Sequence, residues 1–240
     1  ANTTAYSLND IVISSGWLWQ CTTAGTTSGS ATLTVPTTSE SAWSTTGVTN
    51  GTATFRALSS ASLGWLVQDS YANSLTLEHA AFINGAYGFR MVDSANTGSS
   101  YPYWAYCFDL ECDHNYYAAV DLSGGLGFNV TQGWFGSTWA GNGIPIGSSY
   151  KGEVILANSR ILGCAQAGVL VNGGTTTKIN NCVIAANSQA ASATYHGVTV
   201  ASGVKNFTIS NNSIGKTANH SGTQGYPVFL VGSNDNYSIV

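Results

Sequence analysis

Short stretches of alternating hydrophobic and polar residues run along most of the chain, and glycine or asparagine separates one stretch from the next. Such alternation predicts half-buried β-strands, and only residues 185–193 offer a weak helical pattern. In the C-terminal half, three segments share one pattern of six residues. The first and last residues are aliphatic, and the third is asparagine. These segments are Leu156–Ile161, Ile179–Ile184 and Ile209–Ile214, and a second short strand follows each of them.

The repeat extends upstream in a looser form, with one hydrophobic anchor in each unit. The anchors are expected at Leu77, Leu110, Val130, Leu156, Ile179 and Ile209. Units of two or three short strands that stack on their neighbours form a parallel β-helix. Equivalent strands would lie about 4.8 Å apart, so Asn158, Asn181 and Asn211 are expected to form a structural ladder of hydrogen bonds. His79 occupies the same position in its unit and is expected to point inward.

The predicted fold class is therefore all-β, with a right-handed parallel β-helix over residues 59–240 and a small β module over residues 1–58. A β-sandwich is the main alternative, but it does not explain why the asparagines recur in register. The spacing between units varies, so loops of different length emerge from the strand ends, and such loops commonly carry function.

Composition narrows the possible partners. Hydrophobic residues make up 43% of the chain, charged residues only 8%, and the net charge is −4. Nucleic acid and anionic lipid both require a basic surface, so neither is an expected partner. No hydrophobic run approaches the length of a membrane helix, and no membrane insertion is expected. The polar surface must consist mainly of hydroxyl and amide groups, which suits uncharged, hydroxyl-rich ligands.

The five cysteines are dispersed and contain no CxxC pair. They are Cys21, Cys107, Cys112, Cys164 and Cys182. An odd number at such spacing favours buried thiols, in a protein that folds in a reducing cytoplasm, over a disulfide framework or a zinc site. No cofactor or metal is expected.

Residues 1–58 differ from the rest, because aromatic residues stand there among threonine, serine and glycine. Short strands are expected at residues 10–13, 17–21 and 52–56. Trp17 and Trp19 lie two positions apart on one strand, where they serve either as sugar platforms or as the core of the module. The segments Asn2–Asp10, Trp19–Gly29 and Asn50–Thr52 resemble a small β module of bacteriophage tail proteins, which is akin to minimal chitin-binding modules.

Joined to a predicted β-helix, this module is similar to part of a phage tailspike or tail-fibre polysaccharide depolymerase. The resemblance implies a viral protein of the virion tail, assembled in the host cytoplasm, that binds and often cleaves bacterial capsule or lipopolysaccharide O-antigen. It also implies a homotrimer. A short β-helix with open ends and an apolar flank leads to the same expectation.

Four of the eleven acidic residues fall between Asp109 and Asp121. With Leu110 as the inward anchor, alternation places Phe108 and Cys112 inward and Asp109, Glu111 and Asp113 outward, about 6.7 Å from one to the next. Stacking Leu77 under Leu110 places Glu78 beneath Glu111. Repulsion between such close carboxylates favours one protonated and one ionised group, which is what glycoside hydrolysis requires. We therefore expect Glu111 as the general acid and Asp109 or Asp113 as the base, with Glu78 as their neighbour.

Aromatic residues flank these acids and can stack on sugar rings. The expected substrate-binding residues are Tyr103, Trp104, Tyr106, Tyr116, Trp134, Trp139 and Arg90. Arg90 would alternatively act as the base of a polysaccharide lyase. The leading hypothesis is an endoglycosidase that hydrolyses bacterial surface polysaccharide. The alternatives are a receptor-binding tail protein without catalysis and a structural β-helix such as an adhesin.

Overall fold

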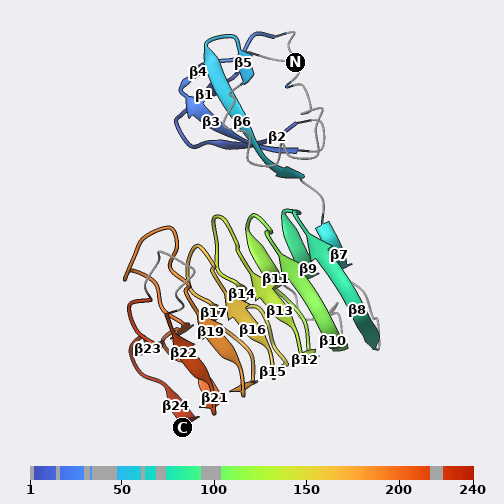
Figure 1. Cartoon of the computed structure of the whole chain (residues 1–240), viewed down its shortest axis with the longest axis vertical. Helices are drawn as coiled ribbons and strands as arrows, with labels where there is room; N and C mark the ends of the chain where they lie inside the picture. The colour runs from blue at the N-terminus through green and yellow to red at the C-terminus, as the bar shows by residue number, and fades with distance from the viewer. Residues whose placement is uncertain are drawn as a thin grey trace. The chain divides into compact units, whose positions relative to one another are not determined.

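The computed structural model describes residues 3–14, 17–29, 33, 48–60, 63–68, 74–92, 104–216 and 224–240. All regular secondary structure in these ranges is β-strand (Figure 1). The chain divides into two compact units, of which the first comprises residues 1–62 with 84–86 and the second residues 63–83 with 87–240. No helix in the described part is long and apolar enough to cross a membrane.

The first unit contains two antiparallel sheets. The smaller one pairs β1 (Ala5–Tyr6) with β4 (Gly25–Thr26). The larger one has the order β2-β3-β6-β5 and consists of β2 (Ile11–Ser14), β3 (Trp17–Thr23), β6 (Ala53–Ser60) and β5 (Val48–Asn50). The three strands expected from the sequence are present, although their ends differ by a few residues.

Trp19 and Phe55 form the centre of the first unit's core, and both are almost fully buried. The indole Nε1 of Trp19 donates a hydrogen bond to the carbonyl of Ser14 at 3.0 Å. Trp17 is partly buried and packs against the same core. Of the two roles considered for this tryptophan pair, the structure therefore supports that of a core.

The second unit is a parallel coil with three faces. The first face contains the N-terminal parts of β8 (Leu75–Ile83) and β10 (Trp104–Asp113), then β12 (Gly127–Thr131), β15 (Glu153–Ala157), β18 (Thr176–Asn180), β21 (Lys205–Ser210) and β24 (Asp235–Ile239). The second face contains the C-terminal parts of β8 and β10, then β13 (Trp134–Gly136), β16 (Arg160–Leu162), β19 (Val183–Ala185) and β22 (Ser213–Gly215). Because β8 and β10 run through both faces, these strands join into one 11-stranded sheet.

The third face is a separate sheet of seven parallel strands. It contains β7 (Leu63–Gln68), β9 (Tyr87–Val92), β11 (Ala118–Leu122), β14 (Ile144–Ile146), β17 (Val169–Val171), β20 (Val198–Val200) and β23 (Val228–Leu230). Successive strands of each face lie side by side, so the chain climbs by one strand per turn (Figure 1). The predicted all-β parallel β-helix is confirmed.

Hydrophobic residues fill the inside of the coil in rows. One row on the first face consists of buried residues at equivalent positions of successive strands, namely Leu77, Cys107, Val130, Leu156, Ile179 and Ile209. All five cysteines of the chain are buried, as predicted. Each row removes apolar surface from water without a gap between turns, which is how so thin a structure obtains a core.

The first and second faces meet at a corner formed by one residue per turn in the left-handed conformation. These residues have φ between 51° and 60° and are His79, Asp109, Gln132, Asn158, Asn181 and Asn211. Asparagine tolerates this conformation better than most residues, because its short amide bonds to nearby groups. The side chain of Asn181 donates to that of Asn158, which in turn reaches Thr131 Oγ1 at 3.4 Å. The predicted asparagine ladder is confirmed between Asn158 and Asn181, and Asn211 occupies the same corner position on the next turn.

The corner corrects the expected anchor of β10. Cys107, and not Leu110, pairs with Leu77, and Leu110 pairs with Ala80 beyond the corner. The left-handed residue Asp109 reverses the alternation at this point, so Phe108 faces outward with 38% of its surface exposed. The prediction that Phe108 points inward was therefore wrong.

Replacement of Asn181 tests the corner. Asn181→Gly should lower the free energy of unfolding by less than about 1 kcal/mol, because glycine keeps the left-handed backbone and loses only an exposed hydrogen bond. Asn181→Ala should lower it by about 1–2 kcal/mol, because alanine also strains the backbone. Chemical denaturation of both variants measures the difference. An alanine variant as stable as the wild type would contradict this account of the corner.

Candidate active site

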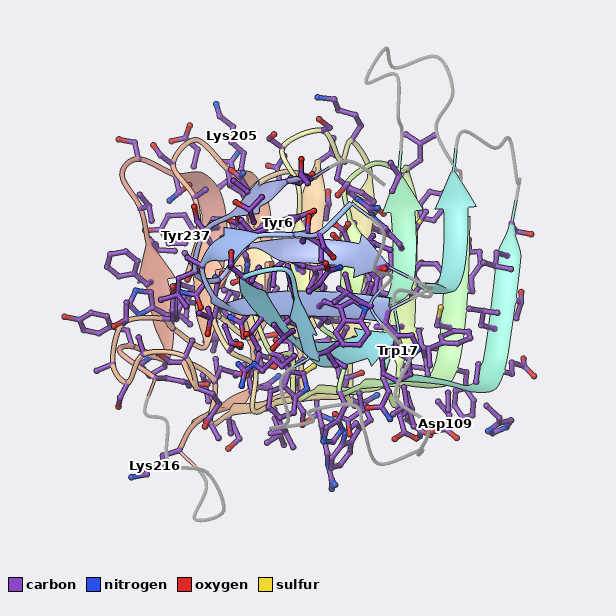
Figure 2. The ribbon with its side chains drawn as sticks, turned by 90° about the horizontal axis from the view of Figure 1, so that it is seen from above. Tyr6, Trp17, Asp109, Lys205, Lys216 and Tyr237 are labelled. Carbon is purple, nitrogen blue, oxygen red and sulfur yellow. The ribbon has the colours of Figure 1, made fainter. Side chains whose placement is uncertain are left out.

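Strand β10 distributes the predicted catalytic acids over two faces. Before the corner, Trp104, Tyr106 and Phe108 point outward from the first face. After the corner, Glu111 and Asp113 point outward from the second face, while Leu110 and Cys112 are buried between them. Asp109 occupies the corner itself and lies on the outside of the coil (Figure 2). The expected row of three carboxylates is thus reduced to a pair.

The register also separates Glu78 from Glu111. Glu78 pairs with Phe108, whereas Glu111 lies between Ala81 of β8 and Trp134 of β13. The prediction that Glu78 lies beneath Glu111 was wrong, because it rested on Leu110 as the anchor. The expected like-charge repulsion between Glu78 and Glu111 on neighbouring turns is therefore absent from this register.

Asp109 pairs with His79, which occupies the same corner one turn earlier. Nδ1 of His79 lies 2.9 Å from Oδ2 of Asp109, and both side chains are more than half exposed. The imidazole also meets the ring of Phe108 edge to face at 5.5 Å between centroids. The inward orientation expected for His79 was wrong, because the left-handed corner turns this side chain toward solvent.

Glu111 and Asp113 stand on the same outward side of one strand. Two residues of a β-strand span about 6.7 Å, so their backbones lie that far apart. Trp134 flanks Glu111 on the next turn with 39% of its surface exposed, and Arg160 follows with its Cζ 5.6 Å from the Trp134 ring centroid. The second face therefore carries a carboxylate pair beside an exposed aromatic ring.

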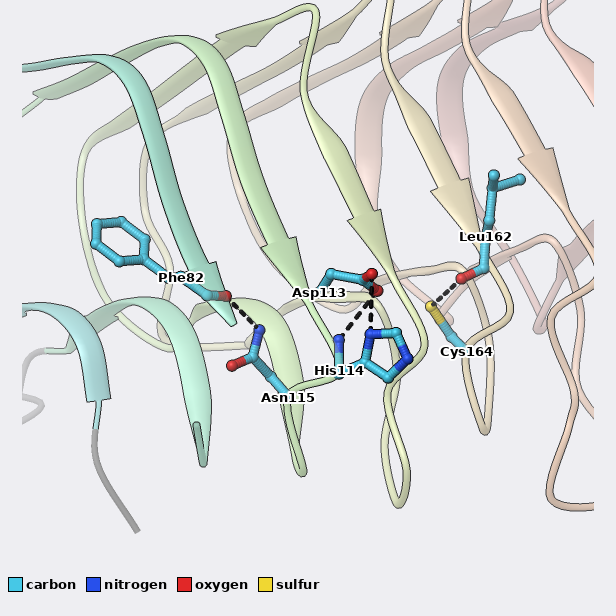
Figure 3. Close-up of polar contacts among 6 residues, drawn as sticks. All are labelled: Phe82, Asp113, His114, Asn115, Leu162 and Cys164. Carbon is cyan, nitrogen blue, oxygen red and sulfur yellow. Dashed lines mark hydrogen bonds and ion pairs between the residues drawn. The ribbon is translucent and has the colours of Figure 1, made fainter. Parts of the chain in front are cut away.

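Asp113 is held in place by the residue that follows it (Figure 3). Oδ1 accepts a hydrogen bond from the backbone N–H of His114 at 3.0 Å, and Oδ2 lies 2.9 Å from Nδ1 of the same residue. His114 has a φ of 53° and begins a second corner, which turns its ring back toward the carboxylate. The side chain of Asp113 keeps 16% of its surface exposed and that of His114 keeps 45%.

Gly136 gives the Asp113 carboxylate the room it needs. It is the partner of Asp113 on β13, and a Cβ at this position would lie 3.2 Å from Asp113 Oδ1 and 2.8 Å from the carbonyl oxygen of Leu162. A side chain here would therefore press on the carboxylate. Sequence reasoning overlooked both Gly136 and the pairing of His114 with Asp113. The adjacency of His114 to Asp113 was the signal available.

A groove of about 380 Å³ lies beside the Asp113–His114 pair, at the second corner. His114, Ser137, Trp139 and Gln189 are among the residues that line it. Trp139 keeps 45% of its surface exposed, and its ring lies 6.3 Å from that of His114. The groove adjoins the carboxylate pair through His114, which lines it and contacts Asp113.

Comparison with known families supports the fold. The family described as the right-handed β-helix region matches residues 66–240, which is well over half of the chain. The chain belongs to the right-handed β-helix family. β-Helix domains are common in carbohydrate-active proteins. No significant match was found among curated proteins or solved structures.

A thiol nucleophile is not part of this β-helix site. Cys164 lies beneath the second corner and donates to the carbonyl of Leu162 at 3.7 Å (Figure 3). Burial raises the pKa of its thiol to about 12, so almost none is ionised at neutral pH. Because the thiolate is the reactive form of cysteine, Cys164 serves packing and not chemistry. Among the described residues, no group of three or more His, Cys, Asp or Glu side chains is placed to hold a metal ion.

Arg90 lies on the third face of the β-helix, away from the carboxylate pair. Its Nε donates to Asp121 Oδ2 at 2.7 Å, and Ser123 Oγ donates to the other carboxylate oxygen at 2.6 Å. The guanidinium also lies over the ring of Tyr87, 4.4 Å from its centroid. A guanidinium with these partners is held as a structural ion pair, so the geometry does not favour it as the base of a lyase.

The remaining predicted aromatic residues fall into three groups. Trp104 and Tyr106 lie on the first face, on the other side of the corner from Glu111. Tyr116 is only 8% exposed and packs edge to face on Tyr117, which gives it a packing role in the β-helix. Tyr103 lies outside the described residues.

Proposed function

We propose that this β-helix binds and hydrolyses a bacterial surface polysaccharide, either capsule or lipopolysaccharide O-antigen. The observation that carries the proposal is the placement of Glu111 and Asp113 on one outward side of β10, beside Trp134 and the groove lined by Trp139. A pair of carboxylates is the usual machinery of glycoside hydrolysis, and exposed aromatic rings stack on sugars.

The two carboxylates suit different roles. Asp113 is oriented by the backbone and ring of His114, as a base that positions an attacking water must be. Glu111 is half-buried beside Trp134 and is the candidate general acid for the leaving oxygen. The carboxyl groups of inverting enzymes lie about 6.5–9.5 Å apart, and a backbone spacing of about 6.7 Å between Glu111 and Asp113 allows their carboxyl groups a separation in this range. The reaction should therefore invert the anomeric carbon.

The biological setting follows from the module at the start of the chain. The resemblance of the segments Asn2–Asp10 and Trp19–Gly29 to a phage tail module supports a place in a virion tail, assembled in the host cytoplasm. Buried thiols are consistent with folding in that reducing compartment. A tail protein that only binds the same glycans is the second candidate, favoured by the aromatic residues that the first face carries apart from the carboxylates.

Glu111→Gln and Asp113→Asn test the reaction. Each should lower the rate of polysaccharide cleavage by about 10²–10⁴-fold while leaving the fold intact, because an acid or base typically contributes that much. Reducing ends released from a panel of purified capsules and O-antigens measure the rate, and NMR of the first product reports the anomeric configuration.

Two matched variants serve as controls. Asp109→Asn removes the corner carboxylate, and Asp235→Asn removes an exposed carboxylate paired with Lys205. Both should cleave close to the wild-type rate. Wild-type cleavage by the Glu111 and Asp113 variants, or a large loss in Asp109→Asn alone, would place the chemistry elsewhere.

We also propose a homotrimer. Large hydrophobic side chains, among them Val183 on the second face and Phe229 on the third, are more than one third exposed. Association would remove this surface from water. Sedimentation equilibrium at micromolar concentration should give three times the chain mass, and a stable monomer would contradict the proposal.

A further inference from the structure

Three aromatic residues form a row on the outward side of the first face. Trp104, Tyr106 and Phe108 follow one another at every second position of β10. Tyr106 is 45% exposed and Phe108 is 38% exposed. The rings of Trp104 and Tyr106 lie nearly parallel, at 11° and 6.2 Å between centroids. Large exposed rings in one row are unusual for a solvated surface and indicate a binding surface.

The neighbouring strand β12 has a glycine where the Trp104 ring packs against it. Gly127 of β12 pairs with Trp104, and a Cβ on Gly127 would lie 1.9 Å from Cε3 of the indole. Only glycine therefore lets the Trp104 ring rest against β12. The position of this ring is determined by the backbone beneath it, so the row is preorganised for a ligand.

A groove of about 370 Å³ lies along the Tyr106 and Phe108 part of this row. The two rings lie in the middle on β10, while Thr76 and Glu78 on β8 and Asn129 and Thr131 on β12 supply polar groups on both flanks. Apolar rings between hydroxyl, amide and carboxylate groups match the two kinds of surface on a sugar, its C–H faces and its hydroxyl edges.

The charges around the groove define the class of sugar. Among the described residues that line it, Glu78 is the one charged side chain, and none is basic. Glu78 would repel a polyanionic glycan inside the groove, and the nearest cation in register, Lys178, lies one strand beyond the lining residue Ile155. The lining also contains the hydroxyls of Thr76 and Thr131 and the amide of Asn129. Hydroxyl and amide groups exchange hydrogen bonds with sugar hydroxyls, which favours a sugar over an apolar protein surface.

We propose that the first face holds a second, non-catalytic site for a neutral oligosaccharide. The site is separated from Glu111 and Asp113 by the corner at Asp109, which turns β10 from one face to the next. It rests on the proposed function only in drawing its ligand from bacterial surface polysaccharides, of which it would take the neutral ones. Such a site would hold the polymer while the second face acts on it, and the two contacts would reinforce each other.

The test compares polysaccharide binding by single alanine variants of the full chain. The probes are dextran, mannan, galactan and a set of purified neutral O-antigens, with polysialic acid as the anionic comparator. Tyr106→Ala and Phe108→Ala should each weaken binding of a neutral probe by about tenfold, because each removes a stacking ring. Tyr226→Ala is the matched control, since Tyr226 is also exposed, at 58%, but lies just before β23 of the third face. Polysialic acid should not bind at the first face.

Binding is measured by surface plasmon resonance in two backgrounds, the wild type and the Glu111→Gln/Asp113→Asn double variant. Loss of binding on Tyr106→Ala in both backgrounds supports the second site even if no polysaccharide is ever cleaved. Cleavage that depends on Glu111, with unchanged binding by both aromatic variants, would support the proposed function and overturn the second site. The site is equally overturned if the wild type binds no neutral probe, or if the variants change the sedimentation mass and not the affinity.

Discussion

The structure depends on one left-handed residue at the same position of every turn. A strand that continued straight would leave the coil, so the chain must change direction, and a single left-handed residue does this without a loop. The parallel strands keep equivalent residues in register, and the backbone of one corner bonds to the next, as in the bond from the N–H of Asn158 to the carbonyl of Asn180. A second left-handed row at His114, Ser137, Gly163 and Ala186 begins the turn from the second face toward the third. The core rows and the arrangement of the faces follow from these corners.

The corners also determine what each face presents. Asp109 separates the aromatic row of β10 from the carboxylate pair, so one strand supplies two surfaces that point in different directions. The second corner brings the His114 ring to Asp113 and opens the groove beside it. Glycine appears where these groups need space, at Gly127 under Trp104 and at Gly136 beside Asp113. Because the strands are rigid and regular, these positions are set by the backbone and not by flexible loops.

The sequence predicted the fold wherever the corner residue was asparagine. The recurring asparagine indicates the left-handed position at Asn158, Asn181 and Asn211. The aliphatic residue two positions earlier lies in the core. The prediction failed two coils before Asn158, where Asp109 occupies the corner and Cys107 the core position. Leu110 is also buried, and leucine is more hydrophobic than cysteine, so hydrophobicity alone favoured Leu110 over Cys107 as the anchor. That error of three positions moved Glu78 onto Glu111 and turned Phe108 inward. The pairing of His114 with Asp113 and the ion pair of Arg90 with Asp121 depend on three-dimensional neighbours, for which a single sequence holds only weak signals.

The register of β8 against β10 can be tested directly by disulfide trapping. Equivalent residues of neighbouring parallel strands lie about 4.8 Å apart, within the reach of a disulfide, whereas three further residues add about 10 Å along the strand. The structure pairs Glu78 with Phe108. The Glu78→Cys/Phe108→Cys variant should therefore form an intrachain disulfide on mild oxidation, detected by mass spectrometry after proteolysis. The Glu78→Cys/Glu111→Cys variant should remain reduced. A disulfide in the second variant but not in the first would show that Leu110 is the anchor after all, and would contradict the separation of the two faces.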